Sequence, residues 1–242
     1  MKPIIVTAAT NMEISLLISQ LEGGGRIISG HREIFEGMIA GKRTILAMTG
    51  IGKVNAASAT TALLEHFEPE IFISTGCAGA YDGGGLAVGG LAIATAELFG
   101  DEGVMTPEGW RSMELIGIPA LSRNGEDYFN RFPLTRWAID KAIYVAETEG
   151  ITLQQGEFVT LSTASGSAER GAELFRRFGG ICENMEGGAV AHVAAFYGVD
   201  CMEIRGISNM VEDRDPARWD IPLAVELAQR FIAKFIAALC RV

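Results

Sequence analysis

Short apolar runs and longer amphipathic stretches alternate along this chain of 242 residues. Residues 4–6, 71–73 and 91–98 are nearly continuous apolar runs, which are typical of strands covered on both faces. Between such runs, apolar side chains recur every three or four positions, which is typical of helices that bury one side. The pattern predicts helices over residues 12–21, 53–67, 135–149, 168–178, 187–197 and 221–239.

Strands that alternate with helices over the whole length predict an α/β fold, with three α/β/α layers around a central mixed sheet. A hairpin is expected over residues 33–48, because alternating apolar residues lie on both sides of a turn at Gly41 and Lys42. Residues 99–131 form a long, polar connection, and such connections are more often functional than not. Neither a repeat nor a low-complexity linker divides the chain, so a single domain over residues 1–242 is expected.

Charge and composition narrow the classes of function. The formal net charge is −10 and no run of Lys or Arg occurs, which argues against binding to nucleic acid. The four cysteines lie far apart without CxxC spacing, which indicates neither a metal site nor a disulfide framework. No apolar stretch reaches the roughly 18 residues of a membrane span, and the N-terminus does not resemble a signal peptide. A soluble, cytoplasmic protein without membrane association is therefore expected.

The densest polar chemistry lies in residues 182–209, which read CENMEGGAVAHVAAFYGVDCMEIRGISN. Glu186 stands where a predicted strand passes into a helix, so its carboxylate can accept helix amides and still point outward. Gly198 is well placed to end that helix. A mostly apolar strand follows, which contains Glu203 and Arg205 and ends at Ser208 and Asn209.

Five fragments follow predicted strands, and a doubly wound sheet would bring them to one edge. They are Glu13, residues 49–53, the small-residue loop 75–80, residues 185–186 and residues 208–209.

Singly, these features have ordinary explanations. An acid such as Glu13 is stabilised by the helix dipole in the first turn of a helix, and an asparagine such as Asn209 is common in turns and helix caps. Residues 50–53, GIGK, lack the spacing of a Walker loop, so they are a weak phosphate motif. Cys77 suits a small buried filler, and His192 suits a packed core histidine.

Taken together, the fragments resemble a known superfamily. TGIGKVNAA (residues 49–57), STGCAGA (74–80), NMEGGAVAHV (184–193) and IRGISN (204–209) are similar, in this order, to the purine nucleoside phosphorylases and nucleosidases. The similarity is greatest to methylthioadenosine/S-adenosylhomocysteine nucleosidases and, more narrowly, to futalosine hydrolases of menaquinone biosynthesis. It implies a nucleoside phosphorylase-like fold with a partly closed sheet, and cleavage of an N-glycosidic bond through an oxocarbenium-like state.

The resemblance also implies roles for individual residues. Glu13 would activate the attacking water, and Glu186 would hold the ribose 2′ and 3′ hydroxyls while Met185 packs against the sugar. Arg205 would orient nearby acids, although an ion pair with Glu203 explains it equally well. The catalytic set implied is Glu13 and Asn209, and the substrate-binding set is Cys77, Ala78, Gly79, Met185, Glu186 and Ser208.

Two departures from the adenine nucleosidases bear on the substrate. Asn209 stands where those enzymes have an aspartic acid that protonates purine N7, and an amide can donate a hydrogen bond but no proton. The amide favours a 6-oxopurine, although asparagine also pairs with adenine. Cys77 stands where they have a serine near the water.

The resulting prediction is hydrolysis of futalosine to release hypoxanthine. Residues 99–110, FGDEGVMTPEGW, resemble futalosine hydrolases and are expected to shape the pocket for an aromatic 5′ substituent. Futalosine carries a benzoate there, which calls for an arginine, and the sequence offers four that are otherwise read as solvent-facing: Arg111, Arg123, Arg131 and Arg136.

Three alternatives stay open: an adenine nucleosidase, a 6-oxopurine phosphorylase and a non-catalytic nucleoside-binding module. No metal or organic cofactor is implied, and the expected partners are a small nucleoside and further copies of the chain in a homodimer or larger assembly.

Overall fold

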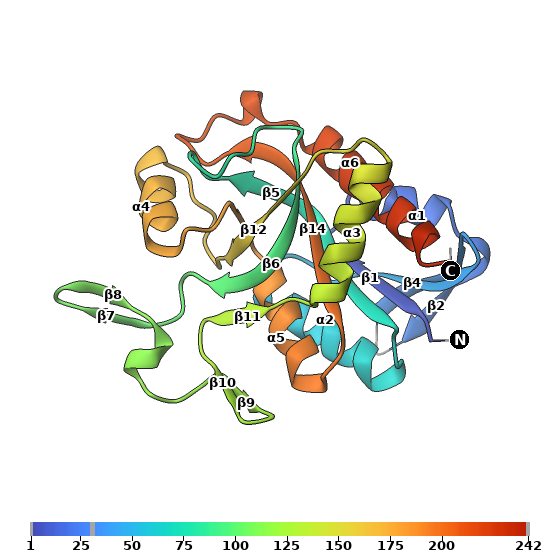
Figure 1. Ribbon diagram of the computed structural model, residues 1–242, viewed down its shortest axis with the longest axis horizontal. Helices are drawn as coiled ribbons and strands as arrows, with labels where there is room; N and C mark the ends of the chain where they lie inside the picture. Colours follow the sequence, from blue (N-terminus) through green and yellow to red (C-terminus); the bar gives the residue numbers. More distant parts are fainter. Residues whose placement is uncertain (1, 30–31, 241–242) are drawn as a thin grey trace.

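The protein is organised around one ten-stranded mixed sheet, seen in a computed structural model that describes residues 2–29 and 32–240 (Figure 1). Along the main path its strands follow the order β11-β6-β12-β13-β5-β1-β4-β3-β2, and β14 joins β5 and β6. Their bounds are β1 (Ile4–Ala8), β2 (Glu22–Ser29), β3 (Arg32–Ile39), β4 (Lys42–Met48), β5 (Ile71–Ala80), β6 (Leu91–Phe99), β11 (Arg131–Pro133), β12 (Leu153–Thr160), β13 (Cys182–Asn184) and β14 (Cys201–Met210).

The sheet closes on itself at one end. β14 pairs in parallel with β5 and antiparallel with β6, while β13 and β12 connect the same two strands on the other side. The pairings β5-β13-β12-β6-β14-β5 therefore return to their start, and the predicted mixed, partly closed sheet is confirmed. Because closure pairs every strand of this ring on both sides, it removes edges and brings their ends together.

Helices cover both faces of the sheet, as the pattern predicts. Side chains alternate along β14, so Gly206 faces Ala224 in one helix whereas Glu203 faces Gly187 in another. Two helices pack against the helix that contains Ala224 and form one group with it. The helix that begins at Gly187 packs against one other helix, and these two form the second group (Figure 1). The first group is α1 (Ser15–Ser19), α3 (Arg136–Thr148) and α6 (Ile221–Ala238), and the second is α2 (Lys53–His66) and α5 (Gly187–Tyr197).

Local sequence signals account for several helix ends. Asp220 caps α6, since its carboxylate accepts from the amide of Leu223 at 3.0 Å, and Pro222 occupies the first turn. Gly198 ends α5 in the left-handed conformation, with φ of 69°. The predicted packing of His192 is also confirmed, because its ring stacks on Phe132 with the centroids 4.4 Å apart.

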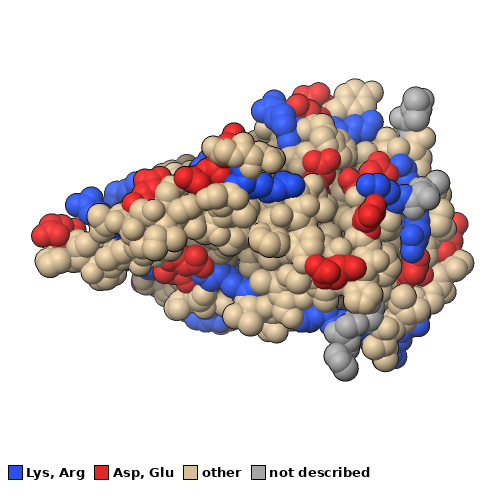
Figure 2. All heavy atoms as spheres, turned by 90° about the horizontal axis from the view of Figure 1, so that it is seen from below, with Lys and Arg blue, Asp and Glu red and all other residues tan. Residues whose placement is uncertain are grey.

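The connection between β6 and β11 projects from the body (Figure 1). It folds into the hairpins β7 (Val104–Thr106) with β8 (Gly109–Arg111) and β9 (Leu121–Arg123) with β10 (Glu126–Tyr128), separated by the 3-10 helix η1 (Met113–Leu115). Trp110 anchors it, packing edge-on against Phe178 of α4 (Ala168–Phe178) with the ring centroids 5.3 Å apart. In Figure 2, basic and acidic side chains are interspersed over the face of the molecule that is shown.

Three element boundaries differ from the prediction. The first helix is only Ser15–Ser19, because Glu13 folds back to accept from the amide of Thr10 instead of starting a helical turn. Residues 75–80 were expected as a loop but continue β5, since β14 pairs with them throughout. The edge strand β2, which includes the glycines at residues 23–25, was not predicted as an element.

The contact between β14 and α6 gives the first prediction. A Cβ atom on Gly206 would collide with the backbone oxygen of Ala224, so Gly206→Ala must push α6 away from the sheet. We expect a loss of about 1–3 kcal/mol of unfolding free energy in urea titrations. Gly25→Ala is the matched control, because a Cβ atom there meets nothing within 4 Å. Equal stability of the two variants would show that α6 is not seated closely on β14.

Candidate active site

All eight residues predicted for the site line one pocket of about 670 Å³. This volume lies in the range of pockets that hold drug-sized ligands. The pocket is lined by the segments that follow β1, β4 and β13 and by the C-terminal parts of β5 and β14. The predicted residues found there are Glu13, Cys77, Ala78, Gly79, Met185, Glu186, Ser208 and Asn209.

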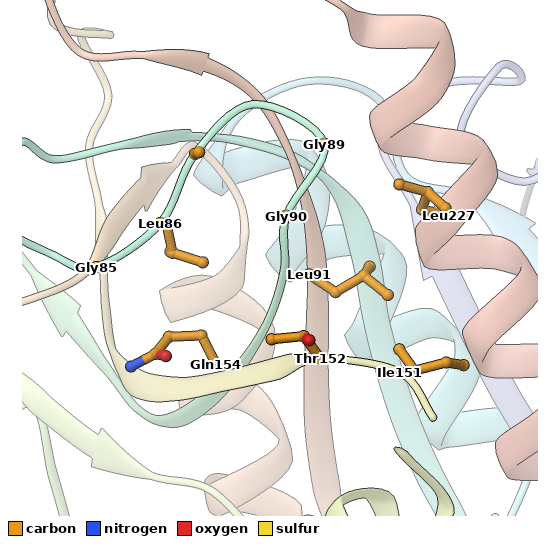
Figure 3. A pocket seen from close by; sticks show the side chains of 10 residues that line it. Gly85, Leu86, Gly89, Gly90, Leu91, Ile151, Thr152, Gln154 and Leu227 are labelled. Atoms are coloured by element: carbon orange, nitrogen blue, oxygen red, sulfur yellow. The ribbon is translucent and has the colours of Figure 1, made fainter. Parts of the chain in front are cut away.

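A second pocket, of about 340 Å³, lies elsewhere and has a different character (Figure 3). It is lined by small and apolar residues and two polar ones (Figure 3): Gly85, Leu86, Ala87, Gly89, Gly90, Leu91, Ile151, Thr152, Gln154 and Leu227. No charged side chain contributes to this lining, so it offers few groups for acid–base chemistry. The pocket that contains Glu13 and Glu186 is therefore the candidate active site.

The carboxylate of Glu13 is buried and held from several sides. One oxygen accepts from the amide and the hydroxyl of Thr10, at 2.9 and 2.8 Å. The other accepts from the amide of Cys77 at 3.1 Å, with the thiol sulfur 3.6 Å away. Hydrogen bonds of this kind fix the orientation of a carboxylate.

Cys77 keeps its proton at neutral pH. Burial, and then the neighbouring charge of Glu13, raise the pKa of this thiol to about 11. A neutral thiol is a weak donor and a poor nucleophile, so Cys77 can orient Glu13 but cannot attack a substrate. Gly76 makes the arrangement possible, because a Cβ atom there would lie 2.5 Å from Glu13 Oε1 and 2.7 Å from Arg205 Nη1.

Glu186 is the second buried carboxylate of the pocket. One of its oxygens accepts from the amide of Gly52 at 2.9 Å, and the other lies 3.6 Å from Arg205 Nη1. Burial raises the pKa of this carboxyl, while Arg205 and the Gly52 amide partly offset that effect. Its unfilled lone pairs leave capacity to accept from further hydroxyl donors.

The turn at residues 50–53 thus serves Glu186 through a backbone amide. The side chain of Lys53 does not line the pocket but pairs with Asp101 and Glu102, at 2.6 and 3.0 Å. Residues 50–53, which match a phosphate-binding motif only weakly, therefore have a structural role, because their backbone holds Glu186.

Beneath the pocket, Arg205 connects Glu186 to a pair of buried acids. Its Nε donates to Glu203 at 2.7 Å, so both alternatives foreseen for Arg205 hold at once. The carboxyl groups of Glu203 and Glu97 lie together beside Gly187, and a Cβ atom at position 187 would collide with both of them. Burial, and then the charge of Glu203, raise the pKa of Glu97 well above its ordinary value, so Glu97 is protonated. One proton and one guanidinium thus offset two of the three carboxyl charges.

Asn184 and Thr160 complete this network. The Asn184 amide donates to Glu97 at 2.7 Å and accepts from the backbone amides of Glu186 and Gly187. Thr160 donates to the other oxygen of Glu97 at 2.6 Å. The network therefore fixes the start of α5 and with it the direction of Glu186.

A polar corner of the pocket surrounds Asn209. Its Oδ1 accepts from the Ser208 hydroxyl at 2.8 Å, and its Nδ2 donates to the carbonyl of Met210 at 3.0 Å. These two hydrogen bonds fix the orientation of the Asn209 amide and leave one of its N–H groups free to donate. Glu183 lines the same pocket and accepts from the amide and hydroxyl of Ser165, both at 2.7 Å.

Several residues that line the pocket are not among those predicted from the sequence. Glu183 and Ser165 are examples, and Arg214 and Trp219 lie in a segment that reads only as a polar connection. Glu183 carries a usable signal, since an acid beside the buried Cys182 needs an explanation.

Two predictions about the pocket's surroundings do not fit this structure. None of residues 99–110 lines the pocket, because the connection folds outward onto α4. None of the four expected arginines lines it either. Arg131 pairs with Glu157 at 2.7 Å and Arg136 with Asp140 at 2.8 Å, whereas Arg111 and Arg123 lie on the projecting hairpins.

Within residues 2–29 and 32–240, no group of three or more His, Cys, Asp and Glu side chains is arranged to hold a metal ion. No helix in that part of the chain is long and apolar enough to cross a membrane. All four cysteines are free.

Comparisons with known proteins identify a family and several relatives of this chain. A family model described as the phosphorylase superfamily matches residues 3–241. A 5′-methylthioadenosine/S-adenosylhomocysteine nucleosidase of Halalkalibacterium halodurans is 34% identical over 211 residues, covering 87% of this chain and 86% of that protein. A futalosine hydrolase of Thermus thermophilus is 34% identical over 189 residues, covering 78% and 79%.

The fold has solved counterparts. The crystal structure of the 5′-methylthioadenosine/S-adenosylhomocysteine nucleosidase from Neisseria meningitidis, in complex with methylthio-immucillin-A, superimposes with a TM-score of 0.85. The two sequences are 28% identical, and the match covers 98% of this chain and 99% of that one. These relatives and this structural neighbour are N-glycosyl hydrolases.

The buried acids give the second prediction. Glu97→Gln should cost no more than about 1 kcal/mol at pH 7, because an amide N–H can replace the carboxyl proton toward Glu203, although the amide nitrogen cannot accept the hydrogen bond that Asn184 or Thr160 donates. Glu203→Gln should cost about 3–5 kcal/mol, because it removes the closest counter-charge of a fully buried arginine. Urea titration of both variants measures the difference, and equal losses would contradict a protonated Glu97.

The pH dependence of the same pair has a definite sign. A carboxyl whose pKa is raised on folding costs stability once pH passes the ordinary carboxyl pKa, since only the unfolded chain then loses its proton. As pH rises from 5 to 8, the stability of Glu97→Gln should therefore increase relative to that of the parent protein.

Proposed function

The chain belongs to the phosphorylase superfamily, and we propose that it is a nucleosidase that hydrolyses 6-oxopurine nucleosides, with futalosine as the substrate. Cleavage of the N-glycosidic bond of nucleosides is the activity that its relatives' names share. The observation that carries the choice of base is Asn209, an amide at the polar corner of the pocket.

Glu186 and Met185 hold the ribose in this proposal. The carboxylate of Glu186 already accepts from Gly52 and faces Arg205, and its remaining lone pairs suit the vicinal 2′ and 3′ hydroxyls. Met185 lines the same wall and supplies an apolar contact for the sugar ring. Negative charge beside the sugar stabilises the positive charge that develops on the ribosyl group.

Glu13 is the general base. Its carboxylate is oriented by Thr10 and Cys77 and lines the pocket together with Glu186. A water oxygen attacks the anomeric carbon and passes its proton to Glu13. The electron pair of the breaking carbon–nitrogen bond leaves with the purine.

Asn209 and Ser208 receive the base. The free N–H of the Asn209 amide can donate to N7 or O6 of a 6-oxopurine, but it cannot deliver a proton to the leaving group. Hypoxanthine leaves more easily as an anion than adenine does, so hydrogen-bond donors alone can suffice. Ala78 and Gly79 present backbone close to the ring, where a larger side chain would intrude.

An adenine nucleosidase is the second candidate, and the relatives named for methylthioadenosine and S-adenosylhomocysteine favour it. An asparagine can also pair with N6 and N7 of adenine. What this chain lacks at position 209 is an acid to protonate N7.

Two further alternatives receive less support. A phosphorylase needs several cations around an attacking phosphate, yet the lining has three glutamates against the single arginine Arg214, and Arg205 beneath it is paired with Glu203. A binding module without catalysis would not need an oriented buried carboxylate such as Glu13. The expected homodimer or larger assembly stays a prediction, supported by the exposed apolar side chains of Ile51, which lines the pocket, and Val54.

The general-base role gives the third prediction. Glu13→Gln should lower kcat for futalosine by 10²- to 10⁴-fold, because the amide cannot take the proton of the water. Binding of futalosine, measured by calorimetry, should change little. Glu226→Gln on the outer face of α6 is the control and should keep full activity. Turnover near the parent rate in Glu13→Gln would remove this residue from the mechanism.

The choice of base gives the fourth prediction. Asn209→Asp should raise the ratio of kcat/KM for methylthioadenosine to that for futalosine by about tenfold or more, because the acid can protonate adenine N7. Asn11→Asp places the same change of charge in the same pocket and should leave the ratio unaltered. An equal change in both variants would show that charge alone, and not position 209, sets the preference.

A further inference from the structure

Arg214 is the one Lys or Arg that lines the pocket among the residues described. It lies in the segment between β14 and α6, with its backbone amide 3.3 Å from the carbonyl of Gly166. Its guanidinium carbon lies 4.5 Å from the centroid of the Trp219 ring, which lines the pocket too. We refer to Arg214 and Trp219 together as the pocket mouth.

The guanidinium of Arg214 forms no ion pair within the described part of the chain, although acids flank it. Asp213 accepts from the amide of Ala168, and Asp215 accepts from the amide of Ala217, both at 3.1 Å. By contrast, Arg218 of the same segment pairs with Glu212 at 2.7 Å. An exposed guanidinium that stacks on an aromatic face keeps its N–H groups free for an incoming acceptor.

The rest of the pocket is unsuited to an anion. Glu13, Glu183 and Glu186 contribute carboxyl groups to its lining, and the chain carries a formal net charge of −10. Arg205 beneath the pocket is already balanced by Glu203 and Glu186. A substrate with a negative group would therefore be repelled everywhere except at the pocket mouth.

We propose that Arg214 and Trp219 form a subsite for a 5′ substituent that ends in a carboxylate, preferably one attached to an aromatic ring. The inference rests on the proposed function, in which Glu186 takes the ribose diol, Glu13 faces the anomeric carbon and Asn209 takes the base. The 5′ end is then the part of the nucleoside left to reach the mouth. The planar guanidinium of Arg214 can donate to both oxygens of a carboxylate, and the Trp219 ring can stack against an aromatic ring of the substituent.

The test compares acid and ester forms of one substrate. Futalosine and its methyl ester differ in the negative charge and one methyl group, and kcat/KM is measured for both with Arg214→Met, Arg214→Lys and Arg218→Met. Arg214→Met should lower kcat/KM for futalosine by roughly tenfold while changing the ester less than about twofold. Arg214→Lys should restore part of the loss, because the charge remains but the fork does not.

Arg218→Met is the matched control. It removes a cation from the same segment but from outside the pocket lining, so it should affect neither compound. The preference for the acid should also weaken at high salt, since the subsite is open to solvent. S-adenosylhomocysteine and its carboxamide, run in parallel, distinguish an amino-acid carboxylate from a benzoate as the preferred source.

The outcomes separate the two proposals. Equal effects of Arg214→Met on acid and ester, or equal effects of Arg214→Met and Arg218→Met, would overturn the subsite. Failure of the parent protein to cleave any nucleoside would overturn the proposed function instead. In that case calorimetry of futalosine and its ester decides the subsite, and loss of the preference for the acid in Arg214→Met supports it.

Discussion

The balance of buried charge around Arg205 is the constraint on which the site depends. A guanidinium that is 1% exposed needs counter-charge nearby, and Glu203 supplies it at Nε and Glu186 at Nη1. Glu97 joins Glu203 without adding a further charge, because burial keeps it protonated. Arg205 thereby offsets part of the rise that burial causes in the pKa of Glu186, which lies at the pocket wall beside the space that the ribose would occupy. An apolar residue in place of Arg205 would leave two acids to repel each other there.

Closure of the sheet provides the framework for this balance. Because β14 pairs with both β5 and β6, it places Arg205 beside Gly76 and Glu203 beside Glu97. These contacts need bare backbone at the points of closest approach, and glycine supplies it at positions 76 and 187. A buried ionic network of this kind contributes orientation to the pocket more than stability to the fold, since charges lose their hydration on burial.

Much of the fold and the composition of the pocket could be predicted because the signals are local. Glu186 before two glycines marks a strand that passes into a helix, and Asp220 with Pro222 marks a helix start. The course of β5 through residues 75–80 could not be predicted, because small residues suit a loop and a crowded strand alike. The pair of Glu97 and Glu203 depends on pairing between strands far apart in sequence. Arg214 was missed because an arginine in a polar segment carries no sign of the pocket it lines.

The central claim is that water, activated at Glu13, cleaves a 6-oxopurine nucleoside without phosphate. Its most direct test is incubation of the protein with futalosine, inosine and methylthioadenosine in ¹⁸O-labelled water, with and without phosphate, followed by mass spectrometry of base and sugar. The account predicts release of hypoxanthine from futalosine at a rate independent of phosphate, with one ¹⁸O atom at the anomeric hydroxyl. A phosphate-dependent rate with a sugar 1-phosphate as product would contradict it.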